Sequence, residues 1–249
     1  MIEMEKQGKV AVLTLDRPKV NAINQEWMTR FNAILDDLEG AEDIGVVRIR
    51  SAHKVFCAGF DIGLIKEHLE GGGPDAQIED TKKLQDVYNR IERLPQVVIA
   101  EINGAAMGGG LEMALCCDLR MAAEEARMGL PEATLGQVPG AGGTQRLTRL
   151  CGKGVAARII LACEMVDGAT ARELGIVNWA VPGADLDREA AALAERIAVH
   201  PPATLQASKR CIAAQADPAV DGFELEMILN HGLLATPETE ALVNAFFKR

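Results

Sequence analysis

The sequence predicts an α/β fold followed by a helical tail. Short β-branched runs alternate with stretches whose apolar residues recur at helical spacing over roughly the first 150 residues. From about Gly152 onward, alanine-rich helical segments with little strand signal replace this pattern. The 249 residues are 48 % hydrophobic, which is enough for a large core in one domain, or in one domain with an appendage.

Three strands are predicted in the first part of the chain. They are the runs KVAVLTL (9–15), GVVRIRS (45–51) and VVIAEI (97–102), all rich in β-branched residues. Between them, residues 25–38 and 81–94 place their apolar side chains on one helical face. Strands that alternate with helices in this way indicate the α/β class.

The remaining segments predict one loop and several tail helices. Residues 70–75 (EGGGPD) predict a mobile loop, because three glycines and a proline oppose regular structure. Helices are expected at 169–174, 187–199, 202–216 and 222–234.

Charge and composition exclude several classes of function. The net charge is −10, whereas general nucleic-acid binding requires an excess of positive charge. The longest apolar runs, such as 97–100, are far shorter than the ~20 residues of a membrane-spanning helix, and no apolar signal segment opens the chain. We therefore expect a cytosolic protein that binds neither membranes nor nucleic acid. The six cysteines lack metal-ligand spacing, so reduced thiols and no metal are expected.

The first motif that could form a functional site is NGAAMGGGLEM, which follows the strand at 97–102. The glycines at 108–110 stand where a helix should begin, so unpaired N–H groups there could face a ligand atom that carries negative charge. Glu112 falls in the first turn of that helix. The alternative is a close-packed turn without a ligand, in which Glu112 only favours the helix dipole.

Two further motifs are KVFCAGFDI (54–62) and MGLPEATLGQVPGAGGTQRL (128–147). The first bends after a strand and could present another N–H group, or be an ordinary turn in which Asp61 caps the next helix. In the second, Pro131 and Glu132 look like the opening of a short helix, which is good capping chemistry with or without a function. The glycine-rich stretch after them is not a Walker loop, because no Gly-Lys-Ser or Gly-Lys-Thr follows.

In this order and at these separations, the three segments closely resemble the crotonase (enoyl-CoA hydratase/isomerase) superfamily, most of all enoyl-CoA hydratase. The likeness also covers RPKVNAIN (17–24) and DGATARELGIVNWAVP (167–182). It implies a crotonase-type spiral of strand-strand-helix units with a C-terminal helical extension. The implied parts are a core domain, 1–190, and a helical trimerisation region, 191–249, in a homotrimer or a dimer of trimers.

The resemblance also implies a site and a reaction. The backbone N–H groups of Phe60 and Gly109 would form an oxyanion hole for the thioester oxygen, each contributing roughly 3 to 4 kcal/mol. Glu112 would activate a water and Glu132 would deliver a proton to C2, which hydrates a 2-enoyl-CoA to a 3-hydroxyacyl-CoA. Coenzyme A is part of this substrate, and no cofactor is expected. The residues expected to contact the substrate are Ala58, Asp61, Ile62, Gly108, Lys19 and Lys66.

Two departures from the family pattern affect substrate binding. Phe60 stands where relatives often have alanine, and Gly63 stands where many have a lysine that holds the coenzyme A phosphates. The acyl pocket is expected along residues 62–84. The cations that remain as candidates for the phosphates, or as plain surface charges, are Lys19, Lys54, Lys66, Lys248 and Arg249.

Three alternatives stay open at this point. One is an isomerase of the same fold, which needs one base near C2 and no water-handling Glu112. Another is a specialised crotonase that acts on a cyclic or branched acyl-CoA. The most remote is a crotonase-fold protein that binds RNA through the helix at 81–94, which carries acids as well as cations.

Overall fold

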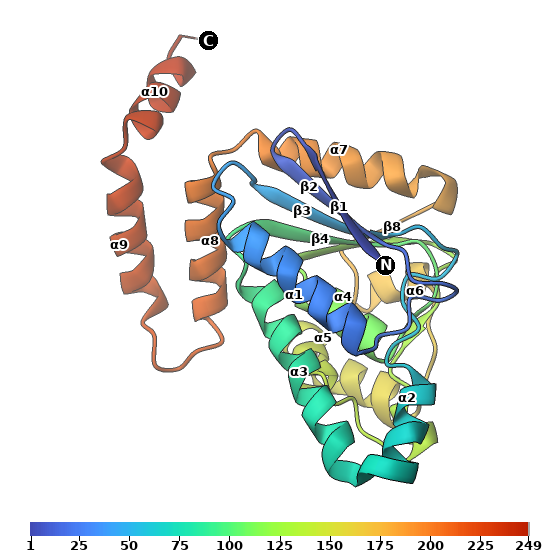
Figure 1. Ribbon diagram of the computed structural model, residues 1–249. Coiled ribbons are helices and arrows are strands. Elements are labelled where there is room, and N and C mark those ends of the chain that lie inside the picture. Colours follow the sequence, from blue (N-terminus) through green and yellow to red (C-terminus); the bar gives the residue numbers. More distant parts are fainter. Residues whose placement is uncertain (249) are drawn as a thin grey trace.

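A six-stranded sheet forms the centre of the computed structural model, which describes residues 1–248 (Figure 1). The strand order is β1-β2-β3-β4-β6-β8, with β1 antiparallel to β2 and all other neighbours parallel. The strands are β1 (Ile2–Gln7), β2 (Val10–Leu15), β3 (Val46–Ser51), β4 (Val97–Ile102), β6 (Leu119–Ala123) and β8 (Trp179–Val181). The predicted α/β class and the three predicted strands are confirmed.

Helices cover both faces of this sheet: α7 (Leu186–Ala198) lies over one face and α1 (Gln25–Glu39) over the other (Figure 1). The central strands are therefore buried along most of their length, as is typical of parallel strands covered on both faces, and the two charged residues inside, Arg48 and Glu101, pair with each other. In register, Val46 lies between Val10 and Val97. Because β3 and β4 are parallel, their carboxyl ends meet at one edge of the sheet, where the first two motifs begin.

The segment predicted as a mobile loop is helical, so the prediction that residues 70–75 lack regular structure is wrong. Helix α2 (Ile62–Glu67) continues into a π-helical turn, η1 (His68–Gly72), and then into α3 (Gly73–Arg93). Gly73 takes φ +69° at the junction, a value that favours glycine. Pro74 falls in the first turn of α3, where the missing N–H group costs no helical hydrogen bond. The glycines and the proline thus redirect the helix.

Short elements connect the first and third motifs. Strands β5 (Ala106–Met107) and β7 (Met128–Gly129) form a small parallel pair. Helix α4 (Gly109–Cys116) follows β5, and a 3₁₀ turn, η2 (Glu132–Leu135), follows β7. Helix α5 (Gly143–Leu161) comes next, with a kink at Gly152.

The predicted tail helices are confirmed, and one short strand among them, β8, joins the sheet. The tail comprises α6 (Gly168–Glu173), β8, a 3₁₀ turn η3 (Gly183–Asp185), α7, α8 (Pro202–Ala214), α9 (Gly222–Leu234) and α10 (Pro237–Phe246). Residue 190, the predicted domain boundary, lies within α7, whose buried face packs on the sheet. The division into 1–190 and 191–249 stays a prediction. Helices α9 and α10 bury no residue and lie apart from the body (Figure 1).

The six cysteines are free thiols, as predicted. Across the described residues, 1–248, we found no helix whose length and hydropathy would let it cross a bilayer.

Candidate active site

The first two motifs lie against each other at the carboxyl edge of the sheet. The backbone N–H of Met107 donates to the carbonyl of Cys57 at 3.0 Å, and the N–H of Cys57 donates to the carbonyl of Ala105 at 3.1 Å. These bonds align the bend after β3 with the turn that enters α4. Two segments roughly fifty residues apart in sequence thereby present their backbones side by side.

Two unpaired N–H groups result from this arrangement, those of Phe60 and Gly109. Residues on either side of Phe60 pair with Ile23: the carbonyl of Gly59 accepts from its N–H, and the N–H of Asp61 donates to its carbonyl, each at 2.8 Å. The Phe60 N–H therefore points away from Ile23, as alternation along an extended segment requires. Gly109 opens α4, where N–H groups have no acceptor within the helix.

The two N–H groups are neighbours in space. A Cβ atom built on Gly109 would lie 3.5 Å from the Phe60 nitrogen. Within residues 1–248, no hydrogen bond uses either N–H as its donor. The structure thus brings together the pair that the sequence suggested as an oxyanion hole.

A buried tyrosine that the sequence did not indicate supports this pair. The Tyr88 hydroxyl, from α3, donates to the carbonyl of Gly109 at 2.5 Å. Burial raises the pKa of the Tyr88 hydroxyl well above its usual value, so the group stays a donor. The bond fixes the glycine whose N–H faces the site.

Glu112 is held in the first turn of α4 with its side chain only 2 % exposed. Its Oε1 atom accepts from the N–H groups of Ala141 at 2.9 Å and Gly143 at 2.7 Å. An added Cβ on Gly143 would lie 2.9 Å from that oxygen, so a larger residue here would displace the carboxylate. Desolvation raises the pKa of Glu112 to about 7, opposed by the Gly143 bond and reinforced by the charge of Glu132.

Arg146, also absent from the sequence-derived site, fixes the loop that holds Glu112. Its guanidinium donates to the carbonyl of Ala141 at 3.0 Å, to Asn89 Oδ1 at 2.7 Å and to Glu92 Oε2 at 2.9 Å. The side chain is almost fully buried. The positive charge also lowers the pKa of Glu112.

Glu132 stands at the start of η2, across the turn that contains Gly108. An added Cβ on Gly108 would lie 2.9 Å from Glu132 Oε1, and Gly108 also takes φ +49°. The Oε2 atom of Glu132 is buried and has no hydrogen-bond partner among residues 1–248. Burial raises the pKa of this carboxyl, which favours a protonated form that can donate.

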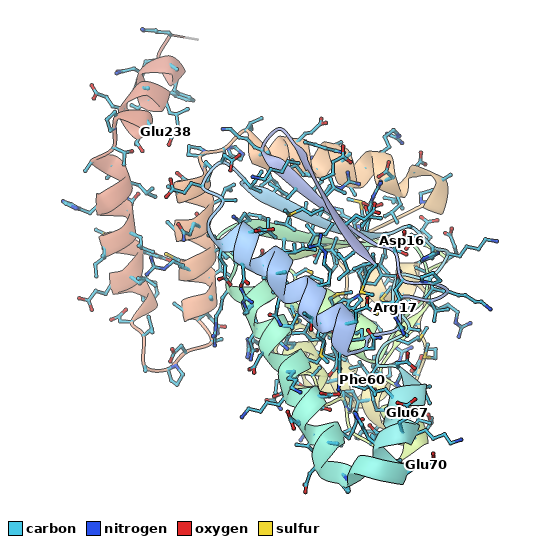
Figure 2. All side chains as sticks on the ribbon, in the orientation of Figure 1. Asp16, Arg17, Phe60, Glu67, Glu70 and Glu238 are labelled. Atoms are coloured by element: carbon cyan, nitrogen blue, oxygen red, sulfur yellow. The ribbon has the colours of Figure 1, made fainter. Side chains whose placement is uncertain are left out.

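The residues expected to contact the substrate differ in their surroundings. Both carboxylate oxygens of Asp61 already have partners within the chain: Oδ1 caps α2 by accepting from the N–H of Gly63 at 3.0 Å, and Oδ2 pairs with Arg17 at 3.0 Å. Ala58 and Ile62 are exposed beside the bend, and Ile62 is 63 % exposed. A cavity of about 290 Å³ adjoins this bend and is lined by Arg17, Asn24, Gln25, Asp61, Gly63, Leu64 and Glu67. Figure 2 shows Arg17, Phe60 and Glu67 on the same side of the molecule.

The candidate phosphate-binding cations lie on the surface. Lys66 is 74 % exposed and lies 3.7 Å from Glu70. Lys19, Lys54 and Lys248 are exposed as well, and Arg249 lies outside the described residues. Residues 1–248 hold no group of three or more acids, histidines or cysteines placed to bind a metal.

Known proteins resemble this chain in both sequence and fold. The family model for enoyl-CoA hydratase/isomerase matches residues 5–247. A short-chain-enoyl-CoA hydratase from Clostridium acetobutylicum is 38 % identical over 84 % of this chain and 79 % of its own length. A 2,3-dehydroadipyl-CoA hydratase from Escherichia coli is 35 % identical over 99 % of this chain and 95 % of its own.

Among solved structures, an enoyl-CoA hydratase from Bacillus anthracis superposes with a TM-score of 0.92 and 33 % identity, covering 99 % of this chain and 96 % of that one. The resemblance seen in the three motifs is therefore confirmed along nearly the whole chain, and so is the crotonase fold. This chain belongs to the enoyl-CoA hydratase/isomerase family.

Proposed function

We propose that this protein is an enoyl-CoA hydratase that adds water across the 2,3 double bond of a 2-enoyl-CoA to give a 3-hydroxyacyl-CoA. The observation that carries the proposal is the buried Glu112 and the half-buried Glu132, whose Oε2 atom is buried, beside two unpaired N–H groups. Hydration needs a base for the water, an acid for C2 and donors for the thioester oxygen. Each of these requirements has a matching group.

The oxyanion is assigned to the N–H groups of Phe60 and Gly109. As water adds at C3, negative charge develops on the thioester oxygen, and preorganised donors stabilise this charge more than they stabilise the uncharged carbonyl. Tyr88 contributes by holding the carbonyl of the same glycine in place. The donors need no reorganisation when the charge appears, because other contacts fix both backbone segments.

Glu112 is assigned the role of base and Glu132 that of acid. Two N–H bonds to Glu112 Oε1 favour its ionised form, which leaves the other carboxylate oxygen to take a proton from water. The buried, unpartnered Oε2 of Glu132 suits a protonated carboxyl that donates to C2. Repulsion between the two carboxylates keeps them from both being ionised.

The alternatives find less support. An isomerase would not need Glu112 to be positioned by the Ala141 and Gly143 N–H groups. The relatives compared above are named as hydratases. RNA binding through α3 is disfavoured because Lys83 pairs with Glu79 and Arg90 pairs with Asp36, which leaves only Lys82 and Arg93 unpaired on that helix within residues 1–248, and because the whole chain carries a net charge of −10. A specialised acyl-CoA substrate remains compatible with the same machinery. Ala58, Ile62 and Gly108 border the proposed site, and the expected acyl pocket along 62–84 stays a prediction.

A panel of acyl-CoA thioesters of different length and branching tests the proposal. Each is incubated with the pure protein and read by mass. A gain of one water identifies hydration, whereas isomerisation leaves the mass unchanged. A panel without any hydrated product would contradict the proposal.

For the assembly, we propose a homotrimer, alone or as a dimer of trimers. Large apolar side chains on α9 and α10 face solvent in the single chain, including Phe223 at 84 %, Met227 at 71 % and Phe246 at 73 % exposure. Exposed apolar surface of this kind marks an interface. Analytical ultracentrifugation tests this, and a monomer at micromolar concentration would contradict it. The cytosolic location stays a prediction from the sequence.

A further inference from the structure

A second cleft lies away from the glutamates, between the body and helix α8. Its volume is about 440 Å³, which falls in the range of small-molecule sites. The body contributes the last turn of α3 and part of α5, and the opposite wall belongs to α8. The charged residues of its lining are Glu92, Arg93, Arg149, Lys209 and Arg210.

The cleft is cationic although the whole chain carries a net charge of −10. Four of its lining residues are cationic, and Glu92 is the one acid among them. The Glu92 carboxylate is already neutralised, because it pairs with Arg146 at 2.8 Å and Arg149 at 3.2 Å. The surplus positive charge therefore has no counter-charge within the lining.

Two of the cations have no ion-pair partner in the part of the chain that the structure describes. Lys209 already has partners within the chain, because its Nζ lies 2.7 Å from Asp118 Oδ2 and donates to the carbonyl of Gln96 at 3.0 Å. For Arg93 and Arg210, by contrast, no carboxylate of residues 1–248 lies within ion-pair distance. One belongs to the body and the other to α8, so like charges face the cleft from both walls.

We propose that this cleft binds a small anion of the phosphate class, which bridges the body to α8. Arginine forks match the oxygens of phosphate, and a dianion would supply the counter-charge that Arg93 and Arg210 lack. The remaining volume accommodates the rest of a small phosphate ester. Since α8 leads into α9 and α10, the anion would also fix the position at which these two helices begin. This site is separate from the proposed hydratase reaction, so it holds even if that reaction is wrong.

Titration calorimetry with inorganic phosphate alone, in chloride buffer of matched ionic strength, tests the proposal. The wild type is expected to bind saturably. The double variant Arg93→Gln/Arg210→Gln should bind about tenfold more weakly or worse, since it loses both unpaired guanidinium groups. A double variant with the same change in charge but outside the cleft, Lys82→Gln/Arg196→Gln, should bind within about twofold of wild type.

Circular dichroism and thermal melts check that both double variants fold. If the cleft double variant is unstable, the single variant Arg210→Gln replaces it, because its side chain is exposed. Phosphate should raise the melting temperature of wild type and of the control more than that of the cleft variant. Absence of saturable binding to wild type, or equal binding to the cleft variant, would overturn the proposal.

Discussion

Gly143→Ala should slow hydration by displacing Glu112 while leaving both glutamates in the chain. The added Cβ would lie 2.9 Å from Glu112 Oε1, 3.0 Å from Glu112 Cγ and 3.0 Å from Leu130 Cδ1. These separations are shorter than ordinary van der Waals contacts, so the carboxylate has to move and its 2.7 Å bond to the Gly143 N–H is weakened or lost. A hydrogen bond to a charged group contributes about 1.5–3 kcal/mol, which corresponds to a loss of roughly 10- to 160-fold in kcat/KM.

The pH profile gives this prediction a second readout. If Glu112 acts as the base, wild-type kcat/KM should rise with pH through about 7 as its carboxyl loses a proton. The Gly143 bond lowers the pKa of Glu112, so losing it raises the pKa further. In Gly143→Ala the rise should therefore occur at higher pH, and part of the activity lost at neutral pH should return in alkaline buffer.

Gly154→Ala is a matched control for that variant. Gly154 lies in the same helix, α5, and an added Cβ there would have no neighbour within 4 Å. This variant should keep wild-type kinetics and melt at the same or a slightly higher temperature, since alanine favours helix. Wild-type kcat/KM and pH profile in Gly143→Ala would refute the assignment of Glu112 as the positioned base.

Three further predictions concern the rest of the site. Glu132→Gln should lower hydration by about 100-fold or more without unfolding the protein; near-normal turnover with a normal melt would remove Glu132 from the mechanism. Tyr88→Phe should lower kcat by about tenfold with little change in KM, because the loss falls on a donor used in the transition state; an equal rise in KM instead would indicate a role in binding. Prolonged dialysis against a chelator should leave turnover unchanged, and activity that returns only with one added metal would contradict a metal-free mechanism.

Much of the site could be predicted because its key groups fall in short motifs. The glycines at 108–110 and Glu112 share one helical turn, and Phe60 follows a strand end, so local pattern and family resemblance identify them. The groups that hold Glu112 could not be found in this way. Gly143 lies 31 residues from it in sequence, and only the folded loop brings its N–H to the carboxylate.

Tyr88 and two features of the fold were not predicted either, and each omission has a physical reason. The single tyrosine of the chain, Tyr88, occupies a helical position indistinguishable from that of a core residue, and its acceptor lies 21 residues away. Strand β8 has three residues, too few to show a period. At residues 70–75, composition indicated a break in the helix, but positive φ at Gly73 changes its direction and a new helix begins at once.

The most direct test of the account is a parallel assay of hydration and isomerisation on Glu112→Gln. The amide is nearly isosteric, and its oxygen can still accept the Ala141 and Gly143 N–H bonds, so the fold should persist in a thermal melt. Hydration of a short 2-enoyl-CoA should fall by about 100-fold or more, because the water loses its base. Two other rates should decrease far less than hydration: proton exchange at C2, which Glu132 catalyses, and conversion of a 3-enoyl-CoA to a 2-enoyl-CoA. If the wild type isomerises without ever hydrating, and the variant isomerises equally well, then Glu112 is only a residue that begins a helix and the hydratase assignment is wrong.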